Sequence, residues 1–328
     1  METPEKKAVR TPGEIAARKA ANKAANKAAN KAANKAAKAV RKATRAARTP
    51  EEIAANKAAR EAINSEKAQL RSRSFKTRYG LGWKPDSVDN RDHRFISKSD
   101  PAILLPIDLR PSCPSVFDQG NLGSCTACAT TTMAQFVRRK QGLVDWAPSP
   151  LFTYYTTRKI EKTVNQDSGA TVRNALKSTV KYGITKEQAW PYQINKFKIN
   201  PNPAVYRQAL LYQTLEYLRL DNTKLDSLKQ CLAEGFPFTF GMDVYESFDS
   251  DIVIQTGIVP MPKFKREFIL GGHCMLAVGW ELINNVPYII VQNSWGVNWG
   301  IKGFCKIPAA YLTNPKLAND FWTIRLEE

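Results

Sequence analysis

The stretch QGNLGSCTAC, residues 119–128, places Cys125 at the beginning of a predicted helix. Apolar side chains recur after it with helical spacing and stop before Gly142, which predicts a helix over 124–140. Unpaired backbone N–H groups and the positive end of the helix dipole stabilise a thiolate at such a position. We therefore expect Cys125 to be a nucleophile rather than an inert buried thiol.

Two later segments supply the groups that a nucleophilic thiol needs. A base must take the proton of the thiol, and a third group must hold the ring of that base. The chain has only two histidines. His93 lies in a polar, irregular stretch, whereas His273 lies in the apolar run LGGHCMLAVG, and Asn293 follows in VQNSWG. The sequence therefore predicts a catalytic set of Cys125, His273 and Asn293.

Together these segments resemble the papain-like cysteine peptidases (peptidase family C1), whose triad is Cys-His-Asn. Gln119, six residues before the cysteine, stands where that family has its oxyanion-hole glutamine. NSWGVNWG at 293–300 resembles the family's asparagine segment. WKPD at 83–86, DNRD at 89–92 and the GSCTA run are similar to the subgroup found in bacteria and large DNA viruses.

The resemblance implies roles for several further residues. The Gln119 amide would donate to the oxyanion, and Trp295 would shield the contact between the histidine and the asparagine. Ser168 and Gly169 would bind the backbone of the substrate. The implied enzyme is a cysteine-type peptidase, an endopeptidase, that acts on a protein or peptide through an acyl-enzyme intermediate. It needs neither a cofactor nor a metal ion.

The sequence departs from the family signature C-G-[SA]-C-[WY] at two positions. Leu122 replaces the first cysteine, so the disulfide that this cysteine normally forms is absent. Thr126 replaces the aromatic residue, which packs and takes no part in the chemistry. These changes affect packing and subsites, and they leave the mechanism intact.

Helical patterns come first and strand patterns later in the region that the resemblance covers, residues 105–325. This order predicts an α+β fold with two subdomains and a cleft between them. The resemblance implies the papain-like arrangement, in which the left subdomain is helical and the right one is built on an antiparallel sheet or barrel. Helical patterns cover 124–140, 171–182, 202–220 and 223–234, and short apolar runs predict strands at 238–244, 275–280, 288–292 and 303–307.

The basic residues are concentrated in an N-terminal tail, residues 1–73. This tail holds 19 Lys and Arg against 7 Asp and Glu, a net +12 of the +19 carried by all 328 residues. AANK occurs four times in succession at 20–35, and large apolar side chains are almost missing. The tail is therefore predicted to be disordered or a solvated helix, either as a spacer or as an arm that binds nucleic acid or another polyanion.

The predicted organisation is a tail over 1–73, a linker or wrapping segment over 74–104, and a peptidase domain over 105–328. The sequence begins without an apolar signal segment and has no apolar run of membrane-spanning length. We expect an intracellular protein, in cytoplasm or nucleus, or a virion protein if the source is a large DNA virus. We also expect free thiols, a monomer and no membrane partner.

Two rival interpretations remain. Cys125 and Cys128 form a C-x-x-C pair, which is typical of redox or metal sites. A structural zinc site needs four ligands, however, and the chain has no second C-x-x-C. The other rival is a nucleic-acid-binding or structural protein with an inactive peptidase domain. The complete set of Cys125, His273, Asn293 and Gln119 favours an active enzyme.

Overall fold

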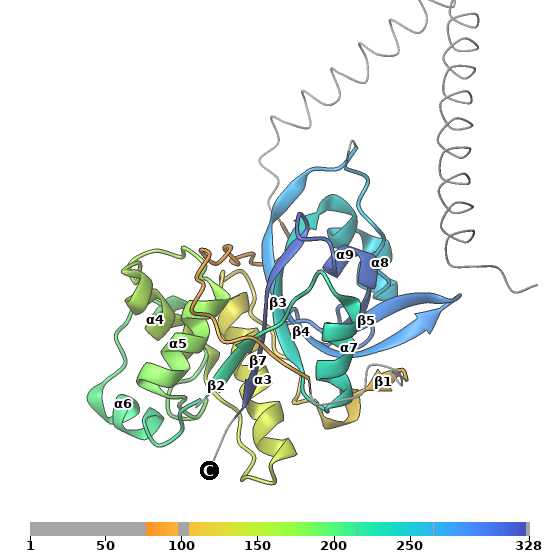
Figure 1. Ribbon diagram of the computed structural model, residues 1–328. Helices are drawn as coiled ribbons and strands as arrows, with labels where there is room; N and C mark the ends of the chain where they lie inside the picture. Colours follow the sequence, from red (N-terminus) through yellow and green to blue (C-terminus); the bar gives the residue numbers. More distant parts are fainter. Residues whose placement is uncertain (1–76, 98–104, 215, 265, 326–328) are drawn as a thin grey trace, which may run out of the picture. The chain divides into compact units, whose positions relative to one another are not determined.

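The computed structural model describes four stretches of the chain, which together include every predicted catalytic residue (Figure 1). The predicted basic tail, 1–73, lies outside the described residues, and so does part of the predicted linker. The described stretches are 77–97, 105–214, 216–264 and 266–325.

The helices on one side of the molecule form a helical subdomain (Figure 1). Its longest helix, α3, packs on α4 and α5 and on strand β4, and therefore buries Met133 and Phe136 of the predicted apolar face. Helices α4 and α5 of this subdomain are capped by Ser149 and Thr171. The hydroxyl oxygen of each accepts a hydrogen bond from a backbone N–H of the first turn. The helices are α3 (Cys125–Lys140), α4 (Pro150–Glu161), α5 (Val172–Tyr182) and α6 (Pro203–Ala209).

An antiparallel sheet forms the other subdomain, with strand order β2-β7-β3-β4-β5-β6 and β1 paired to β4. One face packs against α3 and the other against the remaining short elements, so a hydrophobic core lies on each face. The strands are β1 (Ile107–Asp108), β2 (Glu216–Arg219), β3 (Phe238–Tyr245), β4 (Ile269–Ile283), β5 (Val286–Gln292), β6 (Phe304–Pro308) and β7 (Ala318–Arg325). The remaining helices are α7 (Leu225–Ala233), α8 (Asp251–Thr256) and α9 (Ala309–Leu312), with 3-10 turns η1 (Arg110–Ser112), η2 (Ile194–Lys196) and η3 (Glu246–Asp249).

The α+β order and most predicted elements agree with the structure, and one predicted helix is wrong in its second half. Helix α6 ends at Ala209, and 216–219 is strand β2 because these residues pair with β7. Helix α4 was not predicted, since its Thr and Tyr residues have low helix propensity. Strand β7 was not predicted because it is buried on both faces, which removes the alternating pattern.

Residues 77–97, called the strap, lie between the helices and the sheet (orange in Figure 1). The Gly82 carbonyl accepts from the Ala170 N–H at 2.8 Å on the helical side. The Gly82 N–H donates to the Gly272 carbonyl at 3.0 Å on the sheet side. Farther along, the strap also pairs with β2. The strap is therefore bonded to both subdomains.

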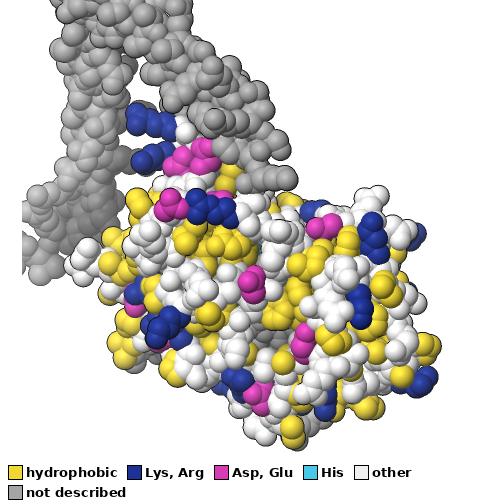
Figure 2. All heavy atoms as spheres, turned by 180° about the vertical axis from the view of Figure 1, so that it is seen from behind, with side chains coloured by type: hydrophobic (Ala, Val, Ile, Leu, Met, Phe, Trp, Pro, Cys, Tyr) yellow, Lys and Arg dark blue, Asp and Glu magenta, His cyan; other side chains and the backbone are white. Residues whose placement is uncertain are grey.

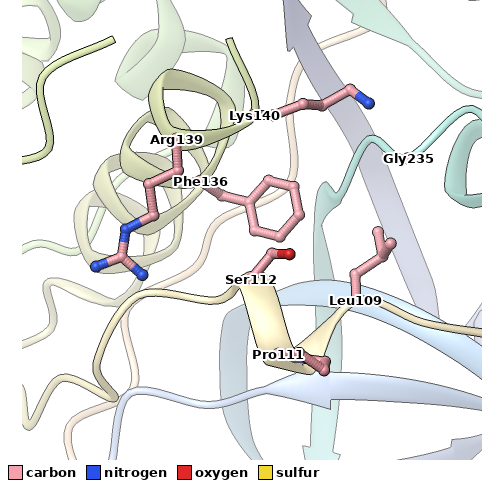
Figure 3. Close-up of a pocket in the computed structure, with 7 residues that line it drawn as sticks. All are labelled: Leu109, Pro111, Ser112, Phe136, Arg139, Lys140 and Gly235. Atoms are coloured by element: carbon pink, nitrogen blue, oxygen red, sulfur yellow. The ribbon is translucent and has the colours of Figure 1, made fainter. Parts of the chain in front are cut away.

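An open hollow of about 330 Å³ lies at the far end of α3 (Figure 3). Phe136 lines it and lies eleven positions after Cys125 along the helix, a distance of about 16 Å. This hollow is therefore remote from the predicted nucleophile. Its full lining is Leu109, Pro111, Ser112, Phe136, Arg139, Lys140 and Gly235.

The surface of the folded part carries both signs of charge. On the face drawn in Figure 2, Lys and Arg side chains are scattered among Asp and Glu. No helix among the described residues has the length and apolar character needed to cross a bilayer.

Candidate active site

Cys125 is the first residue of α3, and its side chain is fully buried. Backbone N–H groups of Cys274, Gly82 and Thr126 face its sulfur. Burial raises the pKa of the Cys125 thiol to about 11, and these N–H groups oppose the rise. The sequence led us to expect a thiolate. With the strap in place the thiol is instead neutral, because the loss of water outweighs the effect of the helix end.

His273 and Asn293 form the hydrogen bond that the sequence predicted. His273 Nε2 and Asn293 Oδ1 lie 2.7 Å apart. Because an amide oxygen only accepts, Nε2 carries the proton and Nδ1 is left as an acceptor. Within the described ranges Nδ1 has no hydrogen-bond partner, and no hydrogen bond joins the ring to the Cys125 sulfur. Burial lowers the pKa of His273 to about 4, and the bond to Asn293 opposes this.

Trp295 covers the His273 ring. The two rings stack with centroids 4.5 Å apart at 26°. Tyr79 of the strap also stacks on Trp295, at 4.4 Å and 8°. The indole is nearly buried, as is the Asn293 side chain. The contact between His273 and Asn293 is thus enclosed by aromatic rings, in the place where the resemblance put Trp295.

The Gln119 carboxamide joins the site to the strap. Its Oε1 accepts from Ser294 Oγ at 2.6 Å. Its Nε2 donates to the carbonyls of Gly80 and Leu122 at 3.0 and 2.8 Å. An amide nitrogen carries two N–H donors, so both are occupied. The Gly80 carbonyl of the strap therefore takes the donor that the resemblance assigns to the oxyanion.

The predicted substrate edge at Ser168 and Gly169 lies against the strap. Gly169 has φ +64°, and a Cβ atom there would lie 2.0 Å from the Gly82 carbonyl oxygen. The backbone bonds to the strap come from the next residue, Ala170, which donates to Gly82 and accepts from Lys84 at 3.0 Å. Ser168 Oγ instead lies 2.8 Å from Thr163 Oγ1 and 3.0 Å from the Gly169 carbonyl oxygen, and its single proton serves one of them. The residue that bonds the strap is therefore Ala170, and a substrate-binding role of Ser168 and Gly169 stays a prediction.

The strap fills the space in front of the thiol. Its backbone bonds to Gly120 on one side and to Gly272 and Ala170 farther along, and the Cys125 and His273 side chains are both inaccessible to solvent. A peptide that used the same edges would need the same space. Access of a substrate to the thiol therefore requires the strap to move.

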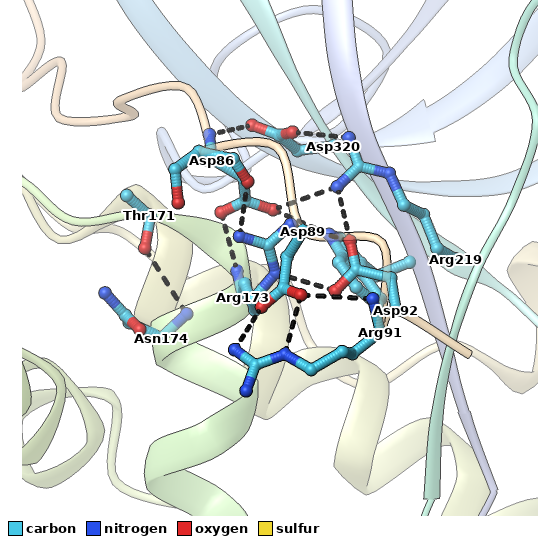
Figure 4. A network of polar contacts seen from close by, with 11 residues as sticks. Asp86, Asp89, Arg91, Asp92, Thr171, Arg173, Asn174, Arg219 and Asp320 are labelled. Atoms are coloured by element: carbon cyan, nitrogen blue, oxygen red, sulfur yellow. Dashed lines mark hydrogen bonds and ion pairs between the residues drawn. The ribbon is translucent and has the colours of Figure 1, made fainter. Parts of the chain in front are cut away.

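Buried carboxylates and guanidinium groups hold the strap (Figure 4). Asp92 pairs with Arg173 of α5 through bonds of 2.6 and 2.9 Å, and with Arg219 of β2 at 3.0 Å. The Asp86 N–H donates to Asp320 of β7 at 2.7 Å, and Asp320 pairs with Arg219 at 3.1 Å. Burial, and then the charge of Asp320, raise the pKa of Asp86 to about 6. Sequence reasoning noted this segment for its resemblance and as a linker or wrapping segment, and it missed these partners.

Cys125 and Cys128 of the C-x-x-C pair form neither a disulfide bond nor part of a metal-binding cluster in the described part of the chain. All six cysteines of the sequence lie in that part and are free thiols. Cys128 lies one turn after Cys125, buried, with Ser124 Oγ 3.7 Å from its sulfur. No group of His, Cys, Asp and Glu side chains among the described residues is arranged to hold a metal ion.

The comparisons with known proteins all find similarity to cysteine proteases. The sequence profile described as papain family cysteine protease matches residues 106–320. An uncharacterized peptidase C1-like protein of Acanthamoeba polyphaga mimivirus is 40% identical over 230 residues, covering 68% of this chain and 73% of that protein. A cathepsin L-like proteinase of Fasciola hepatica is 24% identical over 225 residues, 68% of this chain but 60% of that proteinase.

A solved structure resembles the fold. The crystal structure of xylellain, a cysteine protease from Xylella fastidiosa, has a TM-score of 0.73 with this chain at 36% sequence identity. The match covers 78% of this chain and 99% of xylellain.

Proposed function

Because the chain belongs to the papain family of cysteine proteases, we propose that it hydrolyses peptide bonds with Cys125 as nucleophile, His273 as base and Asn293 as the group that orients the ring. Family membership confirms the relationship, the papain-like α+β fold and the enzyme class that the sequence predicted, a cysteine peptidase. It also implies protein or peptide substrates.

The proposed reaction begins when the strap leaves and water and substrate reach Cys125. His273 Nδ1 takes the thiol proton, and the sulfur attacks the peptide carbonyl. The oxyanion accepts from the Cys125 N–H and from Gln119 Nε2, which Gly80 has released. His273 then gives its proton to the leaving amine, and an acyl-enzyme remains. Water, deprotonated by the same ring, hydrolyses the thioester and restores the thiol.

One observation carries this proposal. His273 Nε2 is hydrogen-bonded to Asn293 Oδ1 at 2.7 Å beneath Trp295, and Nδ1 is free. The N–H of the next residue, Cys274, faces the Cys125 sulfur. A ring with one nitrogen held and the other left as an acceptor is the arrangement that a general base needs. An endopeptidase is the proposed type, since the strap, an internal segment of chain, passes through the site and is bonded to Gly120, Gly272 and Ala170.

The experiment compares Cys125→Ala with Cys128→Ala, a matched loss of a buried thiol one helical turn away. Cys125→Ala should abolish both hydrolysis of a fluorogenic peptide and labelling by an epoxide-type cysteine reagent. Cys128→Ala should keep most of both, because only Cys125 stands six residues after Gln119 and the Cys128 sulfur lies 3.7 Å from Ser124 Oγ. If Cys128→Ala is the inactive variant, the assignment of the nucleophile is wrong.

We propose further that the tail over 1–73 binds polyanions and that the enzyme works as a monomer inside cells, or in a virion if the source is a large DNA virus. The charge of the tail supports the first point, and the similarity to a mimivirus protein supports the last. Sedimentation of the purified chain measures the oligomeric state. Immunodetection in purified particles and in cell fractions measures the location.

A further inference from the structure

We propose that Asp167 is a positioning residue for the oxyanion donor. Through the peptide group that joins Leu122 to Gly123, it fixes the direction in which the Gln119 side chain donates. This inference rests on the proposed peptidase function and adds to it a residue that sequence reasoning missed.

The two N–H groups of the Gln119 amide have different partners. One donates to the Gly80 carbonyl of the strap at 3.0 Å, and this bond ends when the strap leaves. The other donates to the Leu122 carbonyl at 2.8 Å, within the same loop, and does not depend on the strap. Because the amide group is planar, its bonds to Leu122 and to Ser294 Oγ, 2.6 Å from Oε1, determine where the released N–H points.

Asp167 binds the opposite side of the same peptide group. The Gly123 nitrogen lies 3.1 Å from each of the two carboxylate oxygens. This peptide bond is trans, so its C=O and N–H share one plane and point in opposite directions. A bond that holds the N–H therefore also holds the Leu122 carbonyl, and the negative charge of the acceptor polarises the group and strengthens its bond to Gln119.

A buried tyrosine holds the carboxylate in place. Tyr154 of α4 is fully buried, donates to Asp167 Oδ1 at 2.5 Å and accepts from the Gly169 N–H at 3.1 Å. Burial, and then the bond to Asp167, raise the pKa of Tyr154, so the hydroxyl keeps the proton that it donates. Position 122, where the family signature has a cysteine, carries Leu122, so the loop lacks a covalent anchor there and Asp167 supplies a hydrogen-bonded one.

The first measurement is a double-mutant cycle in the full-length chain. Asp167→Ala should lower kcat for a fluorogenic peptide by roughly tenfold, a part of what the loss of an oxyanion donor costs, and should change KM little. Asp167→Asn, which keeps an acceptor oxygen and loses the charge, should fall between the wild type and Asp167→Ala. In a Gln119→Ala chain, Asp167→Ala should lower kcat no further, because the donor that Asp167 positions is already gone.

Asp221→Ala is the matched control. Asp221 also accepts a backbone N–H, that of Thr223 at 3.1 Å, but in the loop between β2 and α7, so kcat should stay unchanged. Equal losses of kcat from Asp167→Ala in the wild-type and Gln119→Ala chains would mean that Asp167 only maintains the fold. No loss in the wild-type chain would mean that it does not position Gln119. Either result overturns the proposal.

A second readout does not depend on catalysis. In a ¹H–¹⁵N spectrum, the Gln119 side-chain amide is the pair of signals that Gln119→Ala removes. Asp167→Asn should shift this pair, because the bond from Nε2 to Leu122 weakens, whereas Asp221→Asn should not. If the pair shifts while the wild type cleaves no peptide, Asp167 positions Gln119 and the proposed function is wrong. If the wild type cleaves peptides and the pair does not shift, the function stands and the role of Asp167 is wrong.

Discussion

At the residue scale, one carboxamide serves both the closed and the open state of the site. Gln119 holds Ser294 through its oxygen and the Gly80 carbonyl of the strap through its nitrogen. In the proposed reaction the same nitrogen donates to the oxyanion. In this proposal the side chain stabilises the strap when the cleft is closed and the transition state when it is open.

Gln119→Ala should have opposite effects on two measurements. Turnover of a peptide substrate should fall by roughly 10²–10³, because an oxyanion donor is lost. Alkylation of Cys125 should become faster, because Gly80 loses its partner. Gln135→Ala, which removes another largely buried glutamine, one whose side chain donates to Asp145 at 2.8 Å, is the control. A fall in both rates would mean that Gln119 only maintains the fold.

Replacing the base should reduce peptidase activity more than replacing the residue that orients it. His273→Ala should remove peptidase activity. Asn293→Ala should reduce kcat less, since the ring loses its partner on Nε2 but still accepts a proton at Nδ1. Steady-state kinetics with a small peptide measures both, and thermal unfolding checks that each variant is folded. Full activity in His273→Ala would contradict the triad.

At the element scale, the strap is held by a buried ion cluster, and breaking it should open the cleft. The Asp92 side chain is 7% exposed and the Arg173 side chain 6%. Asp92→Asn leaves buried guanidinium groups without their charge partner, so alkylation of Cys125 should accelerate by roughly tenfold or more. Asp89→Asn is the matched control, because its ion pair with Arg91 is exposed and lies within the strap. Equal rates in the two variants would show that Asp92 does not hold the strap.

The same cluster predicts a pH dependence. The charged groups facing Asp86 are Asp320, Arg173 and Arg219. Burial, followed by the charge of Asp320, raises the pKa of Asp86 to about 6, so the closed strap binds a proton more tightly than the released strap. The stabilisation is therefore present at low pH and is lost as the pH rises through about 6.

The test measures Cys125 alkylation in the wild type and in Asp86→Asn across that range. The ratio of the wild-type rate to the variant rate should rise with pH, and taking the ratio cancels the titration of the thiol. A ratio that stays constant through this interval would show that Asp86 does not control the strap.

At the scale of the whole molecule, most of the net charge lies in the N-terminal tail, outside the described residues. Residues 1–73 carry +12 of the net +19. The full chain should therefore retard DNA and RNA at low salt, with steep salt dependence and little sequence preference, and a 74–328 form should not. Both forms should cleave a small peptide at similar rates. Equal binding by the shorter form would make the tail a spacer, and much faster cleavage would make it inhibitory.

The sequence by itself determined the family and the order of helices and strands, and it supplied Cys125, His273 and Asn293 as the proposed catalytic residues. These features follow from local causes: the helix that begins at the cysteine, the apolar periodicity of each element, and short motifs that position reacting groups. Where tertiary pairing decides, the prediction failed, as in 216–219, which became strand β2 by pairing with β7.

Only the tertiary structure decided the state of the site. The hydrogen bond from Trp83 to Asp320 joins residues 237 positions apart, and no local sequence pattern predicts such a contact. Burial under the strap, rather than the helix end, sets the pKa of the Cys125 thiol at about 11. The groups that exclude water depend on the path of the whole chain. The closed cleft, the occupied Gln119 amide and the buried Trp83 indole could therefore be found only in the folded molecule.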